Sequence, residues 1–166
     1  MVRVRLRAVR VDFQSNTPVL LLQESDGLGR TLPIFIGNVE ATAIAYALQD
    51  VEVPRPLTHD LLVNVVDALD ATLDRVVVSA LEGSTFYAEL HLGTSEGEVV
   101  VSARPSDAVA LAVRTSSPLY VADELMENQG VLIPAEDDEE IEEDSDDVVE
   151  EFREFLDTIK PEDFEA

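Results

Sequence analysis

Two stretches decide the fold of this chain: LPIFIGNVEATAIAYAL at residues 32–48 and VVVSARPSDAVALAVR at residues 99–114. In each, an apolar strand pattern runs into a helix pattern whose first turn carries a carboxylate, Glu40 in the first and Asp107 in the second. The two carboxylates are 67 positions apart (107 − 40), and at this offset the small apolar residues that follow them coincide. We interpret this as an internal duplication, in which two related halves build one domain around a shared cleft.

The remaining elements repeat in the same order. Alternation of apolar and polar residues predicts strands near residues 2–9, 18–24 and 31–36, followed by a helix at 38–48 and a helical face marked by Leu57, Leu61, Leu62, Val65 and Leu69. The second half predicts strands at 75–81, 85–92 and 98–103, a helix at 105–115, an extended piece at 118–121 and a short helix at 123–128. Three strands followed by two helices, repeated, indicate an α+β fold.

Composition bounds the class of protein. A chain of 166 residues is long enough for one domain with a core. It contains no cysteine, which excludes disulfides, thiolate metal sites and cysteine nucleophiles. The start resembles no secretion signal, and no apolar run approaches the ~18 residues that a membrane span needs. We expect a cytoplasmic protein that does not contact a membrane.

The formal charge of −24 is unevenly distributed. Residues 136–166 hold 17 acidic and two basic residues, so residues 1–135 keep a net charge of −9. This balance disfavours binding to nucleic acid by charge alone. Arginine appears ten times and lysine once, a composition that suits either a salt-rich cytoplasm or a GC-rich genome.

We expect three segments: a domain at 1–134 with halves at about 1–70 and 71–134, an acidic disordered linker at 135–147, and an amphipathic helix and tail at 148–166. Apolar residues fall at helical spacing in the last segment, and such a stripe needs a groove on its own domain or on another chain. We therefore expect a homo-oligomer, a dimer or larger, or docking back onto the same chain. The stripe is formed by Val148, Phe152, Phe155, Leu156 and Ile159.

The densest cluster of chemically active residues is RPLTHD at 55–60, and RPSD at 104–107 repeats its design of arginine, proline, polar residue and acid. Both are well-made helix starts, since proline suits the first helical position and carboxylates suit the positive end of the helix dipole. For Thr58, Asp60 and Ser106 we favour this structural role. For Arg55, His59 and Arg104 a structural role and a functional one are about equally supported.

Four segments resemble signature sequences of the bifunctional nuclease domain family, and a fifth, at the C-terminal end, resembles the tail of the family's bacterial members; all occur in the family's order and cover nearly the whole chain. They are LPIFIG at 32–37, PRPLTHDLL at 54–62, TFYAEL at 85–90, ARPSDAVALAVR at 103–114 and FREFLDTIKPEDF at 152–164. The resemblance implies a duplicated three-strand, two-helix unit that forms one barrel-like mixed sheet flanked by helices. It also implies nuclease activity, because the family takes its name from plant members that degrade DNA and RNA.

These expectations lead to a hypothesis of metal-assisted hydrolysis of phosphodiester bonds in DNA or RNA. Mg²⁺ or Mn²⁺ on carboxylates would supply the positive charge that an acidic protein lacks. The candidate metal ligands are Glu40, Asp60 and Asp107, and the candidate catalytic residues are His59, Asp60 and Asp107. The candidate substrate-binding residues are Arg55, Thr58, Arg104 and Ser106.

The main alternative is a non-enzymatic binding or regulatory module, whose repeat cleft holds a small anion or a partner peptide. A purely structural oligomer scaffold is a third reading. The chain has no phosphate loop, dinucleotide glycine motif, serine-hydrolase elbow or zinc-type spacing.

Two further features favour structural roles. His91 lies in the strand pattern TFYAELHL, and we expect an exposed or edge residue there rather than a ligand. Arg3, Arg5 and Arg7 share one face of the first strand, and this basic stripe suits either the backbone of a nucleic acid or a structural role. We favour the structural role, in which the arginines face solvent or pair with acidic residues of neighbouring strands or of the tail.

Overall fold

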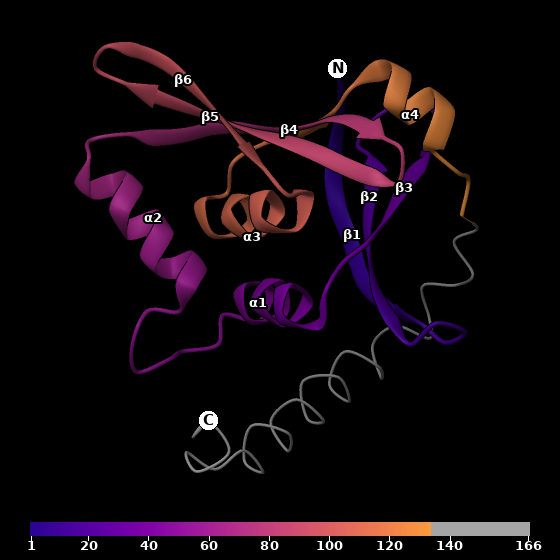
Figure 1. Ribbon diagram of the computed structural model, residues 1–166, viewed down its shortest axis with the longest axis horizontal. Helices are drawn as coiled ribbons and strands as arrows, with labels where there is room; N and C mark the ends of the chain where they lie inside the picture. The colour runs from indigo at the N-terminus through magenta and orange to yellow at the C-terminus, as the bar shows by residue number, and fades with distance from the viewer. Residues whose placement is uncertain (134–166) are drawn as a thin grey trace. The chain divides into compact units, whose positions relative to one another are not determined.

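The computed structural model describes residues 1–133 as seven strands and four helices (Figure 1). The acidic linker and the C-terminal amphipathic helix predicted from the sequence lie outside these residues. The elements in chain order are β1 (Val2–Asp12), β2 (Thr17–Glu24), β3 (Thr31–Phe35), α1 (Asn38–Leu48), α2 (Thr58–Ala68), β4 (Thr72–Glu82), β5 (Thr85–Thr94), β6 (Gly97–Ala103), α3 (Pro105–Thr115), β7 (Leu119–Val121) and α4 (Asp123–Gln129). The mixed α+β class predicted from the sequence is confirmed.

All seven strands form one mixed sheet in the order β3-β2-β1-β7-β4-β5-β6. Each half is an antiparallel three-stranded meander, and the short strand β7 joins the two by pairing antiparallel with β1 and parallel with β4. The barrel-like closure that the family resemblance implied is wrong for this sheet. Its ends are β3 and β6, and no strand in residues 1–133 bridges them, so the sheet is open.

The two halves are alike in their central helices. α1 begins at Asn38 and α3 at Pro105, and both helices have eleven residues, so they are offset by the same 67 positions as the carboxylates (105 − 38). The second half differs in that the extended piece predicted at 118–121 is the sheet strand β7. A common origin of the halves stays a prediction.

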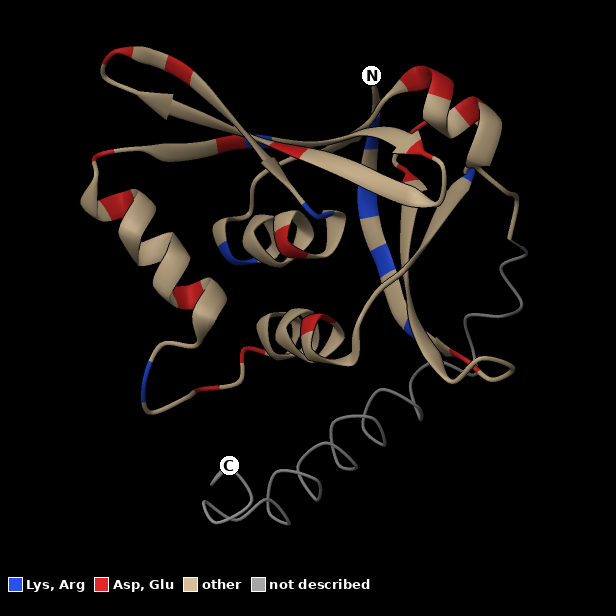
Figure 2. Ribbon diagram, viewed as in Figure 1, with Lys and Arg blue, Asp and Glu red and all other residues tan. Residues whose placement is uncertain are grey.

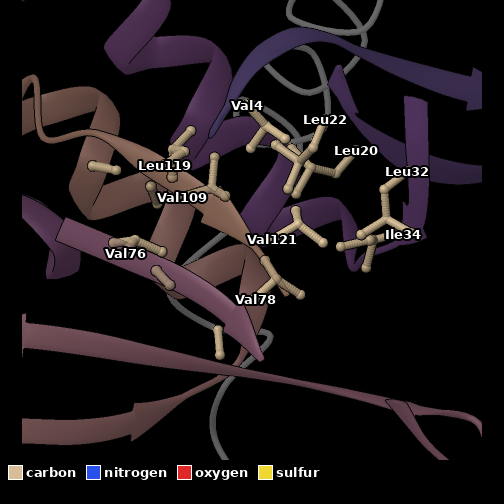
Figure 3. Packing of buried hydrophobic residues seen from close by; sticks show 14 of the residues in the cluster. Val4, Leu20, Leu22, Leu32, Ile34, Val76, Val78, Val109, Leu119 and Val121 are labelled. Carbon is tan, nitrogen blue, oxygen red and sulfur yellow. The ribbon is translucent and has the colours of Figure 1, made fainter. Parts of the chain in front are cut away.

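Small residues allow α1 and α3 to pack closely against each other and the sheet. Ala41 and Ile44 of α1 are buried, and so is the whole run from Ala108 to Ala112 in α3. These residues join a core of branched side chains from both halves of the sheet, many of which are labelled in Figure 3. Burial of these side chains stabilises the fold and fixes the positions of both helix starts.

α2 differs from the other helices because none of its residues is buried. It lies at the periphery in Figure 1, beside α3. The apolar residues that the sequence placed on one helical face, among them Leu61 and Val65, are exposed. The amphipathic pattern predicted the helix correctly, but nothing in the described domain covers its apolar face. None of the four helices is long and apolar enough to span a membrane.

Candidate functional site

The starts of α1, α2 and α3 meet in a network of four charged side chains. The guanidinium group of Arg104 donates from Nε to Asp107 Oδ2 at 2.7 Å and from Nη2 to Asp107 Oδ1 at 3.0 Å. Its Nη1 lies 2.8 Å from Glu40 Oε1. On the other side of Asp107, His59 Nε2 lies 3.1 Å from Oδ1. The structure therefore brings together four of the candidate residues, from both halves of the chain.

Local sequence places each member of this network. Arg104 is the residue before α3, in extended backbone, and Pro105 follows at the first helical position, so Asp107 falls in the first turn. Glu40 occupies the first turn of α1. Its carboxylate lies over Gly37, where a Cβ would overlap Oε2, so glycine at this position leaves room for Glu40 to reach Arg104.

The network keeps the carboxylate of Asp107 ionised. Burial opposes the charge on Asp107, but hydrogen bonds from Arg104 and His59 outweigh it and hold the pKa of Asp107 below its ordinary value of 3.8. Hydrogen bonds to Asp107, with a smaller contribution from Glu40, raise the pKa of Arg104. The His59 side chain is only 12% exposed, whereas that of Arg104 is 65% exposed. Arg104 is therefore the cation of this network that a solvent-borne ligand can reach.

Asp60 is held apart from this network by a second arginine. Arg114 Nε lies 2.5 Å from Asp60 Oδ1, and its Nη1 donates to the carbonyl of Ala110 at 2.9 Å. The other oxygen of Asp60 accepts from the backbone N–H of Leu57 at 2.8 Å, which confirms the predicted role of Asp60 at the start of α2. Burial opposes its charge, but these hydrogen bonds lower the pKa of Asp60.

Arg114 was not among the residues singled out in the sequence, although a signal existed. It lies seven positions after Asp107, two turns along α3 on the same helix face. Its partner Asp60 comes from a distant helix, so only the tertiary structure shows that the pair forms. An open cavity of about 520 Å³ lies beside this pair, and Tyr46, Asp50 and Glu52 also line it.

The other predicted substrate-binding residues lie differently. Arg55 is exposed in the loop before α2, and Thr58 is exposed at the first position of that helix. Ser106 is buried in the first turn of α3, only 6% exposed, which fits the structural role that we favoured for it. These three residues do not take part in the network around Asp107.

The predicted metal ligands do not surround one point. Arg104 lies between the carboxylates of Glu40 and Asp107, and Asp60 is paired with Arg114. No group of three or more His, Asp or Glu side chains in the described domain is arranged to hold a metal ion. Arginines, rather than a ligand set for Mg²⁺ or Mn²⁺, hold these carboxylates in place.

The expectation for His91 is wrong in part. β5 lies between β4 and β6, and His91 is only 9% exposed, because it is an interior residue of the sheet rather than an edge residue. Arg75 Nη2 lies 2.8 Å from His91 Nδ1 and 2.9 Å from Glu98 Oε1. This cluster ties β4, β5 and β6 together. In the first strand, Arg5 Nη2 donates to Gln23 Oε1 of β2 at 2.8 Å.

The model of the bifunctional nuclease domain matches residues 20–134. The chain belongs to the bifunctional nuclease domain family. It is 47% identical over 170 residues to an uncharacterized protein of Mycobacterium tuberculosis, covering 100% of this chain and 99% of that protein.

The plant relatives are more distant. The chain is 28% identical over 119 residues to bifunctional nuclease 1 of Arabidopsis thaliana, which covers 70% of this chain but 37% of the plant protein. It is 22% identical over 130 residues to bifunctional nuclease 1 of Oryza sativa subsp. japonica, which covers 76% of this chain and 39% of that protein. Both matches therefore cover less than half of the plant proteins.

Proposed function

We propose that this bifunctional nuclease domain hydrolyses phosphodiester bonds in DNA or RNA at the network of His59, Arg104 and Asp107. The observation that carries the proposal is the contact of His59 with Asp107 beside the exposed guanidinium group of Arg104. A general base and a cation for phosphate are the two groups that such a hydrolysis needs. The family membership supports the same reaction class.

In this proposal His59 activates the attacking water. Asp107 accepts the hydrogen bond of Nε2 and holds the imidazole ring, so a proton taken from water enters at Nδ1. The water oxygen forms a bond to phosphorus while the bond to the leaving oxygen breaks, and that oxygen then takes a proton from solvent. The ionised carboxylate of Asp107 stabilises the imidazolium ion that this step creates.

Arg104 supplies the positive charge on the phosphate oxygens. Its guanidinium group is exposed, and Glu40 occupies one of its nitrogens in the free protein. A phosphate that binds there exchanges with the Glu40 carboxylate and keeps the two hydrogen bonds to Asp107. Asp60 and Arg114 act as positioning residues, because they fix the start of α2 relative to α3 and so orient His59.

A divalent cation is the further component of this proposal, with Glu40, Asp60 and Asp107 as its ligands. The carboxylates predicted to bind it are paired with arginines, so binding of Mg²⁺ or Mn²⁺ would require these pairs to open. The assay below therefore measures metal dependence directly.

A second candidate function is the binding module without turnover. The cavity beside Asp60 favours it, because Asp50 and Glu52 line that cavity together with Asp60. Three carboxylates against one arginine suit a basic group of a partner peptide better than a small anion. Thermal stabilisation by a basic peptide, without cleavage of nucleic acid, would support this function instead.

The test is cleavage of labelled single-stranded DNA and RNA by the purified full chain, with Mg²⁺, with Mn²⁺ and with a chelator. Cleavage should be lost in His59→Ala and in Asp107→Asn, while Asp67→Asn, an exposed substitution on the same helix as His59, should leave it unchanged. Circular dichroism verifies that each variant is folded. Cleavage that survives both site substitutions would refute the proposed site.

A further inference from the structure

The exposed face of α2 forms a continuous apolar stripe. Leu57, Leu61, Val65 and Leu69 follow one another at intervals of four residues, and they are 40%, 56%, 44% and 73% exposed. Four large apolar side chains in one row form a contiguous exposed apolar patch, and such patches often mark interaction sites. In Figure 2, α2 carries acidic residues only toward its two ends, with a basic residue in the loop before it.

We propose that a second copy of this chain covers this stripe, with the two α2 helices packed antiparallel across a two-fold axis. The stripe is symmetric about Val63, since Leu57 and Leu69 lie six residues from it and Leu61 and Val65 lie two. Antiparallel packing therefore places Leu57 opposite Leu69, and Leu61 opposite Val65, in both directions. A two-fold interface requires this kind of self-complementarity, and rows spaced by four residues are the ones that helix pairs most often interdigitate.

The charges at the ends of α2 favour the same arrangement. Arg55 lies eight residues before Val63, and Asp70 lies seven residues after it. Antiparallel packing thus brings Arg55 of each copy close to Asp70 of the other. Parallel packing would instead place Arg55 against Arg55 and acid against acid.

The C-terminal stripe at residues 148–159 is a less favourable occupant of this face. Residues 148–166 hold seven acidic and two basic residues. They would add negative charge beside Asp60, Asp67 and Asp70. Arg55, just before α2, is the basic residue nearest to this helix in sequence. The charge pattern therefore favours a second copy, and this inference does not depend on the hydrolysis proposed above.

The test is the mass of the full chain in sedimentation equilibrium. The wild type should have twice the chain mass of 18.2 kDa. Leu61→Asp combined with Val65→Asp places charges in the centre of the stripe and should raise the dissociation constant roughly a hundredfold or more. Leu28→Asp, at a residue that is 75% exposed in the turn between β2 and β3, is the matched control and should leave the dimer intact.

The antiparallel register has its own test. Arg55→Glu should raise the dissociation constant by roughly two- to thirtyfold at low salt, because two symmetric pairs with Asp70 are lost, and Asp70→Arg in the same chain should restore part of the affinity. A monomeric wild type would overturn the proposal. Crosslinking of α2 to residues 148–166 in such a monomer would identify that segment as the occupant of the stripe instead. A dimer unaffected by the stripe substitutions, or by Arg55→Glu, would also overturn it.

Discussion

Replacing Asp107 by asparagine removes the charge from the centre of the site at almost constant volume. An amide has a single acceptor oxygen, so either Arg104 or His59 must then face an N–H donor. Loss of the pair with Arg104 costs about 0.2–1 kcal/mol, because that side chain is mostly exposed. Weakening the bond to the nearly buried His59 costs about a further 1–1.5 kcal/mol, the difference between a charged and a neutral acceptor.

The expected loss of unfolding free energy for Asp107→Asn is therefore about 1–2.5 kcal/mol. Urea denaturation followed by circular dichroism should show it as a midpoint lowered by about 0.5–2 M. Asp67→Asn is the control, since Asp67 is exposed on α2 and should change stability by less than about 0.5 kcal/mol. If the two variants unfold at the same urea concentration, Asp107 does not link α2 to α3 as described.

Three further predictions concern other contacts. Arg30→Ala should lower the free energy of unfolding, measured with denaturant, by about 3 kcal/mol, because it leaves the Glu24 carboxylate, only 3% exposed, without its cation. Glu24→Gln should lower it by less, and equal losses would contradict this reasoning. The pKa values of Asp60 and Asp107 are lowered on folding, so the folded state binds fewer protons than the unfolded state. The urea midpoint should therefore fall as the pH drops below about 4 through the folded pKa values. A constant midpoint would be inconsistent with these pairs. Ile44→Ala should lower the free energy of unfolding by about 2–5 kcal/mol, because Ile44 is fully buried, and a cost below about 1 kcal/mol would show that α1 is not packed as described.

The helices at 38–48 and 105–115 could be predicted from the sequence because their signals are local. Small apolar residues repeat along both, and Pro105 marks a first helical position that any tertiary structure would respect. The strand segments were also predicted to within a few residues, since alternation reports which residues share a face. Local patterns thus determined the elements and their order.

Whether a face is covered is not local information. The leucines and valines of α2 predicted a helical face correctly, yet none of them is buried in the described domain. His91 follows the same logic in reverse: its strand pattern could not show that β6 pairs beside it and leaves it enclosed. Closure of the sheet also depends on whether its two end strands meet, which no single strand reveals.

Pairing of charges depends on the tertiary structure for the same reason. Glu40 and Asp107 were predicted to converge from the matching positions of two helices, and the structure brings both to Arg104. Their assignment as metal ligands assumed that no cation of the chain was present between them. Arg104 lies three residues before Asp107, so their pairing could be predicted from the sequence. Its contact with Glu40 requires α1 and α3 to pack side by side.

These contacts serve stability and the proposed chemistry at once. The bond between His59 and Asp107 joins α2 to α3, so a variant that loses cleavage by unfolding would resemble one that loses its base. Arg104 separates the two roles better, because its guanidinium group is exposed and contributes little to folding. A hydrolase requires that this group exchange Glu40 for a phosphate, whereas a binding module for a basic peptide uses the carboxylates of the neighbouring cavity. Whether a phosphate displaces Glu40 from Arg104 is therefore the property that distinguishes the two functions.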